Sequence, residues 1–240
     1  MLIKTQAICL KSFPYKESST IVSLLTQELG LKTCIIKGGR KHNAVIKSSY
    51  FQPLQPIDVV IYYGNKSSFC QIKECNLTCD MTNTYTNMVK ISLSFFLTEV
   101  LTLSLKEDNP NEEMFSYLIK TISYLNDCED EKNLKDFHIY FLYHLACHLG
   151  FEPMDNYSED TPFFDISKGL FVNITDIQTL DRNMSSLFHK VISFIRDNYS
   201  YYTQTAFERR DLLNVFILFF EQHITNNRPI KSQKILQTIL

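Results

Sequence analysis

The chain has 240 residues, of which 45% are hydrophobic and 21% are charged, and its formal net charge is −2. This composition is typical of a globular protein with one large domain or two modest ones. The one long apolar run, residues 212–220, is too short to span a bilayer and is interrupted by Asn214, so we expect no transmembrane helix.

The start of the chain, Met1 to Lys4, lacks the charged, apolar and small-residue regions of a signal peptide, so we expect a cytoplasmic protein. The number of cysteines is seven, an odd number, and in a reducing compartment these are expected to be buried or free thiols.

Charge is distributed unevenly. Residues 1–50 contain eight Lys or Arg against two acids, whereas residues 106–165 contain four Lys against fourteen acids. The basic N-terminal segment and the acidic central segment indicate two modules, and the N-terminal module is the candidate for binding a polyanion.

The first 77 residues predict five short strands separated by turn signals. Thr5, Ala7 and Cys9 alternate with polar neighbours in the first, and strand formers continue in four further stretches: residues 20–25, 31–37, 56–63 and 69–77. Residues 27–30 and 64–66 are expected hairpin turns. With a longer connection between the third and fourth strands, this pattern predicts a five-stranded OB-fold barrel over residues 1–80, a nucleic-acid-binding domain.

Residues 81–240 predict an all-α helical domain. Helical apolar periods cover residues 87–105, 114–125, 134–149, 186–198, 205–223 and 232–240. Gly150 is placed to end the third helix, and Thr205 with Glu208 forms a capping box for the fifth. Residues 151–181 form an insertion or connector with a small hairpin at residues 163–172. The expected fold class is therefore α+β.

The basic turn Lys37-Gly38-Gly39-Arg40-Lys41 closes the third predicted strand. Two glycines allow the backbone to approach a ligand, and three cations attract a polyanion. Single-stranded nucleic acid is bound by basic grooves with aromatic platforms. The candidate nucleic-acid-binding residues are Lys11, Tyr15, Lys16, Lys37, Gly38, Gly39, Arg40, Lys41 and Lys47. The alternative from composition alone is that the lysines are solvated and the aromatic residues belong to the core.

A second set of cations lies near the C-terminal helices. Arg209, Arg210 and Lys231 flank apolar helix surface, and such cations can receive an acidic, hydrophobic peptide tail. The alternative interpretation, which these residues alone favour, is charge complementarity at helix ends.

Metal and catalytic motifs are weak. His144, Cys147 and His148 lie within one helical turn, but no fourth ligand is identifiable, so we favour a packed helix with surface histidines. No phosphate-binding loop, nucleophile elbow or paired Cys-His signature is present, and we expect no enzyme. A hydrolase or transferase with scattered catalytic residues is the weakest alternative.

These residues together resemble the RecO family of recombination mediator and DNA repair proteins. The resemblance depends on six segments in order, with Lys231-Ser232 downstream: Ala7-Ile8-Cys9-Leu10-Lys11, Pro14-Tyr15-Lys16-Glu17-Ser18-Ser19, Leu24-Leu25-Thr26 with Leu29-Gly30, Lys37-Gly38-Gly39-Arg40-Lys41, Phe51-Gln52-Pro53-Leu54 and Leu149-Gly150-Phe151-Glu152-Pro153.

The resemblance implies an OB domain joined to a helical domain without catalytic activity, acting at the nucleoid. Such proteins bind single- and double-stranded DNA, promote annealing, associate with RecR and recognise the acidic C-terminal tail of single-stranded DNA-binding protein. They thereby help to load RecA recombinase onto coated strands. The alternative is a protein-interaction adaptor whose barrel binds no nucleic acid.

Many members of that family carry a four-cysteine zinc module after the Leu-Gly-Phe-x-Pro motif. Residues 154–185 of this chain contain no cysteine, so we expect no metal cofactor. The hairpin is then expected to be held by apolar packing of Phe163, Phe164 and Phe171.

Overall fold

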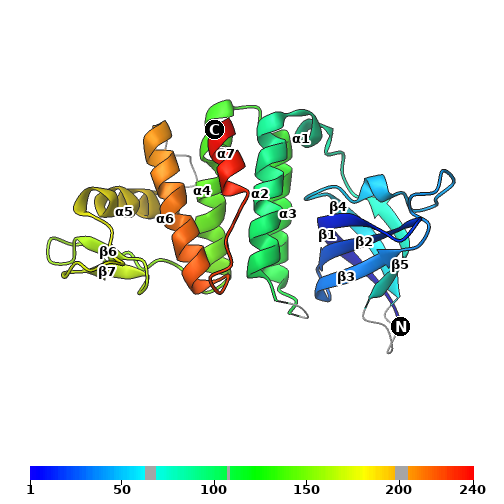
Figure 1. Ribbon diagram of the computed structural model, residues 1–240, viewed down its shortest axis with the longest axis horizontal. Coiled ribbons are helices and arrows are strands. Elements are labelled where there is room, and N and C mark those ends of the chain that lie inside the picture. Colours follow the sequence, from blue (N-terminus) through cyan, green and yellow to red (C-terminus); the bar gives the residue numbers. More distant parts are fainter. Residues whose placement is uncertain (63–68, 107–108, 198–204) are drawn as a thin grey trace. The chain divides into compact units, whose positions relative to one another are not determined.

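Five strands close into a barrel in the computed structural model, which describes residues 1–62, 69–106, 109–197 and 205–240 (Figure 1). The order around the barrel is β1-β2-β3-β5-β4, with β3 and β5 parallel and the other pairs antiparallel. The strands are β1 (Leu2–Tyr15), β2 (Ser19–Thr26), β3 (Gly30–Ile36), β4 (Pro56–Tyr62) and β5 (Cys70–Leu77). This is the predicted OB-type topology.

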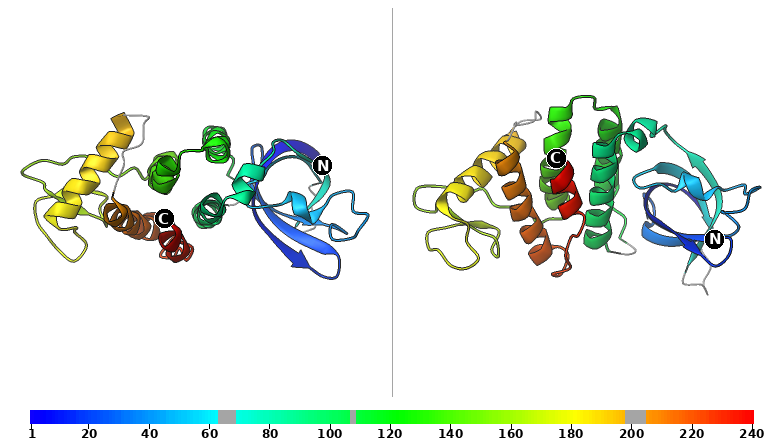
Figure 2. Two further views of the ribbon diagram at one scale, coloured as in Figure 1. Left: turned by 90° about the horizontal axis from the view of Figure 1, so that it is seen from above. Right: turned by 45° about the horizontal axis from the view of Figure 1, so that its top comes forward.

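The long strand β1 belongs to both halves of the barrel wall. Its first half pairs with β4 and its second half with β2, and a register shift between Cys9 and Lys11 lies where it changes partner. Such bulges bend a strand and help a sheet to close. Alternate residues point inward and form an apolar core that includes Ala7, Val22 and Ile57, all fully buried. Figure 2 shows the barrel strands in two further views, coloured from blue to cyan.

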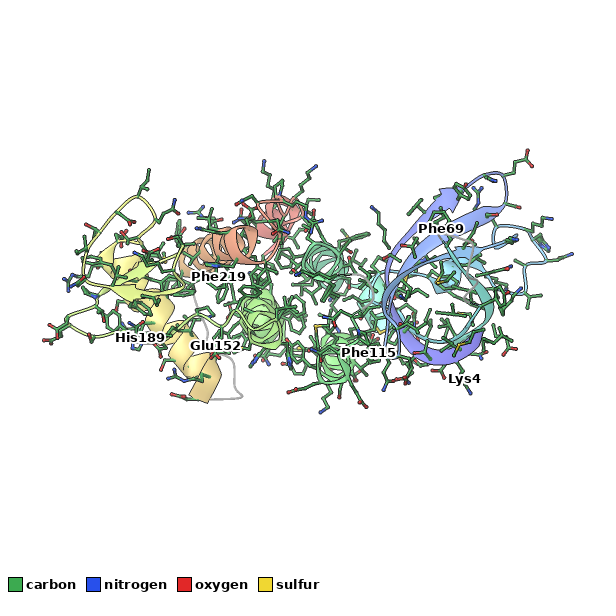
Figure 3. The ribbon with its side chains drawn as sticks, turned by 90° about the horizontal axis from the view of Figure 1, so that it is seen from below. Lys4, Phe69, Phe115, Glu152, His189 and Phe219 are labelled. Carbon is green, nitrogen blue, oxygen red and sulfur yellow. The ribbon has the colours of Figure 1, made fainter. Side chains whose placement is uncertain are left out.

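Three helices follow the barrel within the same compact unit, residues 1–127. They are α1 (Thr82–Thr86), α2 (Met88–Ser104) and α3 (Glu112–Asp127). The Asn87 side chain caps α2 by accepting from the amides of Val89 and Lys90. Asn126 near the end of α3 accepts hydrogen bonds from the amide and hydroxyl of Thr84, at 3.2 and 3.0 Å, and so fixes α1 against α3. Phe115 (Figure 3) is buried in this unit.

The second compact unit, residues 128–240, is mostly helical. It contains α4 (Glu131–His148), the strands β6 (Phe163–Asp165) and β7 (Leu170–Val172), α5 (Arg182–Asp197), α6 (Ala206–His223) and α7 (Gln233–Ile239). Gly150 has φ +77°, the left-handed conformation that ends α4 as predicted. Both halves of the capping box at Thr205 and Glu208 are formed.

The β6–β7 hairpin packs on helices through aromatic rings. The Phe164 ring lies 5.0 Å from that of Phe171 and 4.5 Å from that of Phe188, measured between centroids, and all three side chains are buried. Phe219 (Figure 3) extends this cluster from α6. Phe163 is only half-buried, with the Arg182 guanidinium 5.3 Å from its centroid. The predicted apolar packing is therefore confirmed for Phe164 and Phe171.

The structure confirms the predicted fold class and most predicted elements. The differences are local. The first strand was predicted to be short, but β1 runs from Leu2 to Tyr15. Helix α1 was not predicted, because five residues are too few for a helical period, and α5 begins at Arg182 rather than at Ser186. The predicted turn at residues 64–66 lies outside the described residues. The strands end and the helices begin near residue 80, whereas the compact units divide between Asp127 and Cys128. None of the described helices is long and apolar enough to cross a membrane.

Candidate nucleic-acid interface

The basic turn is shaped by its two glycines in different ways. Gly38 has φ +71°, a conformation that residues with a side chain rarely adopt, and its carbonyl accepts from the Lys41 amide at 3.0 Å. Gly39 is buried, and its carbonyl accepts from the Ser48 amide at 3.0 Å. The turn is thus folded back on the rest of the β3–β4 connection.

Gly39→Ala is expected to destabilise the barrel by about 1–3 kcal/mol, because overpacking a close contact forces neighbouring atoms to move. A Cβ at this position would lie 2.9 Å from Ile36 Cγ2 and 3.2 Å from the Ile46 carbonyl oxygen. Urea unfolding of the variant measures the loss. Because Gly39 has no positive φ, the loss would come from this contact and not from left-handed backbone strain. Equal stability of Gly39→Ala and the parent chain would contradict the contact.

Arg40 joins two loops of the barrel. Its guanidinium Nη2 donates to the carbonyl oxygens of Lys16 and Glu17, the latter at 2.6 Å, and its amide donates to the Ser18 carbonyl at 3.2 Å. The Thr20 and Ser48 hydroxyls meet at 2.8 Å and add a second link. The β1–β2 turn and the β3–β4 loop therefore lie together at one end of the barrel.

Three lysines of the β3–β4 connection remain exposed beside this joint. They are Lys37, Lys41 and Lys47, and no hydrogen bond or ion pair of their side chains is found among the described residues. An ammonium group without a protein partner can neutralise a phosphate at no cost of breaking an existing contact.

Two more candidate lysines lie over aromatic rings of β1 and its turn. The Lys11 ammonium is 5.9 Å from the centroid of Phe13, and the Lys16 ammonium is 5.4 Å from that of Tyr15. Phe13 is 41% exposed, so its ring is available for stacking. Lys16 has φ +52°, which places it at the apex of the β1–β2 turn that Arg40 holds. Cations and aromatic rings thus occur side by side, as they do on surfaces that bind single-stranded nucleic acid.

The second candidate set forms a cavity within the helical unit. A space of about 270 Å³ is lined by residues of α4, α6 and α7: His138, Ala206, Phe207, Arg209, Arg210, Leu213, Leu236, Gln237 and Leu240. The Arg210 guanidinium lies 5.4 Å from the Phe207 ring centroid at the exposed side. Lys231 is exposed and is not among the lining residues.

Arg209 is buried rather than exposed, being 7% accessible, and its Nε lies 3.3 Å from Oδ1 of Asp136 on α4. Its Nη1 has no hydrogen-bond partner among the described residues. A buried guanidinium with an unused donor at the wall of an apolar cavity favours a carboxylate ligand.

Burial, together with the nearby charge of Arg209, lowers the pKa of His138 to about 3. The folded unit therefore keeps this imidazole neutral below pH 6.5, where the unfolded chain binds a proton. The contribution of His138 to the free energy of unfolding is therefore complete above its pKa in the unfolded chain. Below that pH the free energy of unfolding falls by about 1.4 kcal/mol per pH unit, until the pH reaches the pKa of His138 in the folded unit.

We expect His138→Gln to reduce the loss of stability between pH 7 and pH 5 by about 2 kcal/mol, since glutamine does not titrate. Urea unfolding of both chains at the two pH values measures this difference. An unchanged pH dependence would show that folding does not lower the pKa of His138.

The residues of this chain do not fit the zinc module of the family it resembles. No group of three or more His, Cys, Asp or Glu side chains in the described segments is arranged to hold a metal ion. His144, Cys147 and His148 lie near the end of α4, where burial chiefly lowers the pKa of His144 and raises that of Cys147 to about 11. At the hairpin, the Asp165 carboxylate is satisfied by protein donors, among them the Ser167 and Lys168 amides at 2.9 and 3.1 Å.

Several residues of these surfaces were not predicted from the sequence. Phe207, Leu213 and Leu236 line the cavity, and the only signal for them is their apolar character near Arg209 in α6 and α7. The pairing of Arg209 with Asp136 joins residues 73 positions apart and leaves no local signal.

Comparison with known proteins places the chain in a family. Its residues 1–79 match the family model for the recombination protein O N terminal region, and residues 85–161 match the C terminal model. DNA repair protein RecO of Flavobacterium johnsoniae is 30% identical over 243 residues, covering all of this chain and 99% of the relative. The RecO proteins of Flavobacterium psychrophilum and Phocaeicola vulgatus are 29% and 26% identical, again over the whole chain and 99% of each relative. The chain belongs to the RecO family of DNA repair proteins.

Proposed function

We propose that this protein is a non-enzymatic recombination mediator that binds single- and double-stranded DNA and promotes annealing. The observation that carries the proposal is the joint made by Arg40, which holds two loops together and leaves Lys16, Lys37 and Lys41 exposed around it. Exposed cations on a fixed backbone suit phosphate binding, and the rings of Phe13 and Tyr15 supply platforms for bases.

The mechanism that we propose is positional. The barrel holds two DNA strands, or one strand coated with its binding protein, close together. The high local concentration then favours base pairing of the strands, or replacement of the binding protein by the recombinase. No covalent step is needed. In this account RecR is a partner, RecA acts on the strand that the mediator prepares, and no metal cofactor takes part.

We further propose that the cavity between α4, α6 and α7 binds the acidic tail of single-stranded DNA-binding protein. Its apolar walls suit a hydrophobic side chain, while Arg209 at the wall and Arg210 at the exposed side suit carboxylates. Charge complementarity of this kind selects an acidic peptide over a neutral one.

Arg210→Glu is expected to weaken binding of an acidic peptide with an apolar C-terminal residue by about tenfold or more, because an attraction becomes a repulsion. Fluorescence anisotropy of the labelled peptide measures the affinity. Lys132→Glu, at an exposed position of α4 outside the lining residues, makes the same change in net charge and is the control. Arg209 is avoided, since removing it breaks its buried ion pair with Asp136 and so changes the fold as well as the charge. An equal loss in both variants would contradict binding at the cavity.

An annealing assay tests the proposed function. Two complementary strands, each coated with single-stranded DNA-binding protein and carrying a fluorescent donor or acceptor, are expected to pair faster when the chain is added. No acceleration on coated or bare strands, with the tail peptide still bound, would favour the protein-interaction adaptor instead.

A further inference from the structure

Two cysteines face each other across the seam that closes the barrel. Cys34 on β3 and Cys70 on β5 are register partners, and both side chains are buried in the barrel core. Neighbouring strands lie about 4.8 Å apart, and partners point to the same side of the sheet. That spacing falls within the range of Cα separations, about 4.4–6.8 Å, over which a disulfide forms without moving the backbone.

The two thiols interact directly. A hydrogen bond between them raises the pKa of Cys34 and, as its largest cause, lowers that of Cys70 to about 7, against the opposing effect of burial and with help from the charge of Lys32. Within the pair, one thiol thus loses its proton more readily than an ordinary cysteine while the other keeps its proton. A thiolate beside a thiol is the arrangement from which disulfides form.

Among the described residues, the seam is also the shortest pairing in the barrel wall. Along it the described residues pair only at Cys34 with Cys70 and at Ile35 with Gln71, whereas β1 pairs with β2 from Ala7 to Tyr15. Short ladders open more readily than long ones. Opening of this short ladder is the route by which we expect a small oxidant to reach the two buried thiols.

We propose that Cys34 and Cys70 form a reversible disulfide that locks the β3–β5 seam when the protein meets hydrogen peroxide. The Cys70 thiolate attacks one peroxide oxygen, the O–O bond breaks, and hydroxide leaves and takes up a proton as water. The Cys34 sulfur then displaces the oxygen of the resulting sulfenic acid, so that an S–S bond forms and a second water leaves. The two sulfurs together lose two electrons, and the peroxide is reduced.

The proposed disulfide is expected to restrict the basic turn, because Cys34 lies three residues before Lys37 in the sequence. Closing the seam fixes the end of β3, from which the turn emerges. The inference does not depend on DNA binding, since its test measures a covalent bond.

Peptide mapping of the full chain after graded hydrogen peroxide, without reduction, tests the proposal. The expected product is a cross-linked peptide pair joining Cys34 to Cys70, lighter by two hydrogen atoms and restored by dithiothreitol. The oxidised barrel is also expected to melt about 5–10 °C higher, as a native-like disulfide stabilises a small domain.

Two serine variants complete the design. Cys34→Ser is expected to lose the cross-link, whereas Cys75→Ser, also at the barrel core, is expected to keep it. Mapping the natural chain needs no variant, so a poorly folding Cys34→Ser chain does not block the test. Oxidation that stops at the exposed Cys79 or joins other cysteines, with Cys34 and Cys70 still reduced, would overturn the proposal.

Discussion

Lys37→Glu combined with Lys41→Glu is expected to weaken binding of single-stranded DNA about 30-fold at low salt, because two phosphate contacts become repulsions. Both side chains are exposed at the joined loops, and neither holds the fold together. The magnitude of the slope of log affinity against log salt is expected to fall by about 1.4 if each lysine contacts one phosphate. Anisotropy titrations of a labelled oligonucleotide across a salt series measure both values.

The matched control is Lys120→Glu combined with Lys132→Glu, which makes the same change in net charge at exposed helix positions. It is expected to leave the salt slope unchanged. Arg40 is not a suitable target, because its guanidinium holds the carbonyl groups of Lys16 and Glu17, and its loss disturbs the loops as well as the charge. Equal affinity of the basic-turn variant and the parent chain would remove this turn from the DNA surface.

Phe164→Ala is expected to destabilise the hairpin and the helices beneath it by about 3–5 kcal/mol, the usual cost of emptying a buried phenylalanine site. Its ring contacts those of Phe171 and Phe188, and its amide donates to the Ser185 hydroxyl at 2.9 Å. Because the chain has two compact units, hydrogen exchange of residues 163–172 during urea titration isolates the loss in this region.

Ile177→Ala, at a side chain 96% exposed in the same connector, is the control and is expected to change stability by less than about 0.5 kcal/mol. A chelator is expected to leave the exchange of the hairpin unchanged in the parent chain, since we propose that aromatic packing rather than a metal holds it. Unfolding of the hairpin by the chelator, or a negligible effect of Phe164→Ala, would contradict that account.

The elements were predictable where local sequence determines them. The turn at residues 27–30, the cap at Thr205 and the end of α4 at Gly150 follow from residues within one turn of each other. The register shift in β1 at Cys9 and Lys11 was not predictable, because it depends on which strands β1 meets along its length.

The same distinction between local sequence and tertiary contacts applies to the residues of the candidate sites. Composition and spacing placed Lys37, Gly38 and Lys41 in an exposed turn, and the structure has them there. The sequence pattern grouped Arg40 and Arg209 with the other exposed cations, but each has partners distant in sequence. Arg40 binds the β1–β2 turn, and Arg209 pairs with Asp136. Such partners follow from the tertiary fold, so a pattern of charges along the chain does not identify them.

Titration of fluorescent single-stranded DNA across a salt series, with and without a saturating acidic tail peptide, tests the central claim most directly. The account predicts a steep salt slope for DNA, and peptide binding that saturates separately without displacing the DNA, because the barrel-loop cations and the cavity belong to different compact units and share no residue. DNA affinity that is insensitive to salt, or peptide that competes with DNA for one surface, would contradict it.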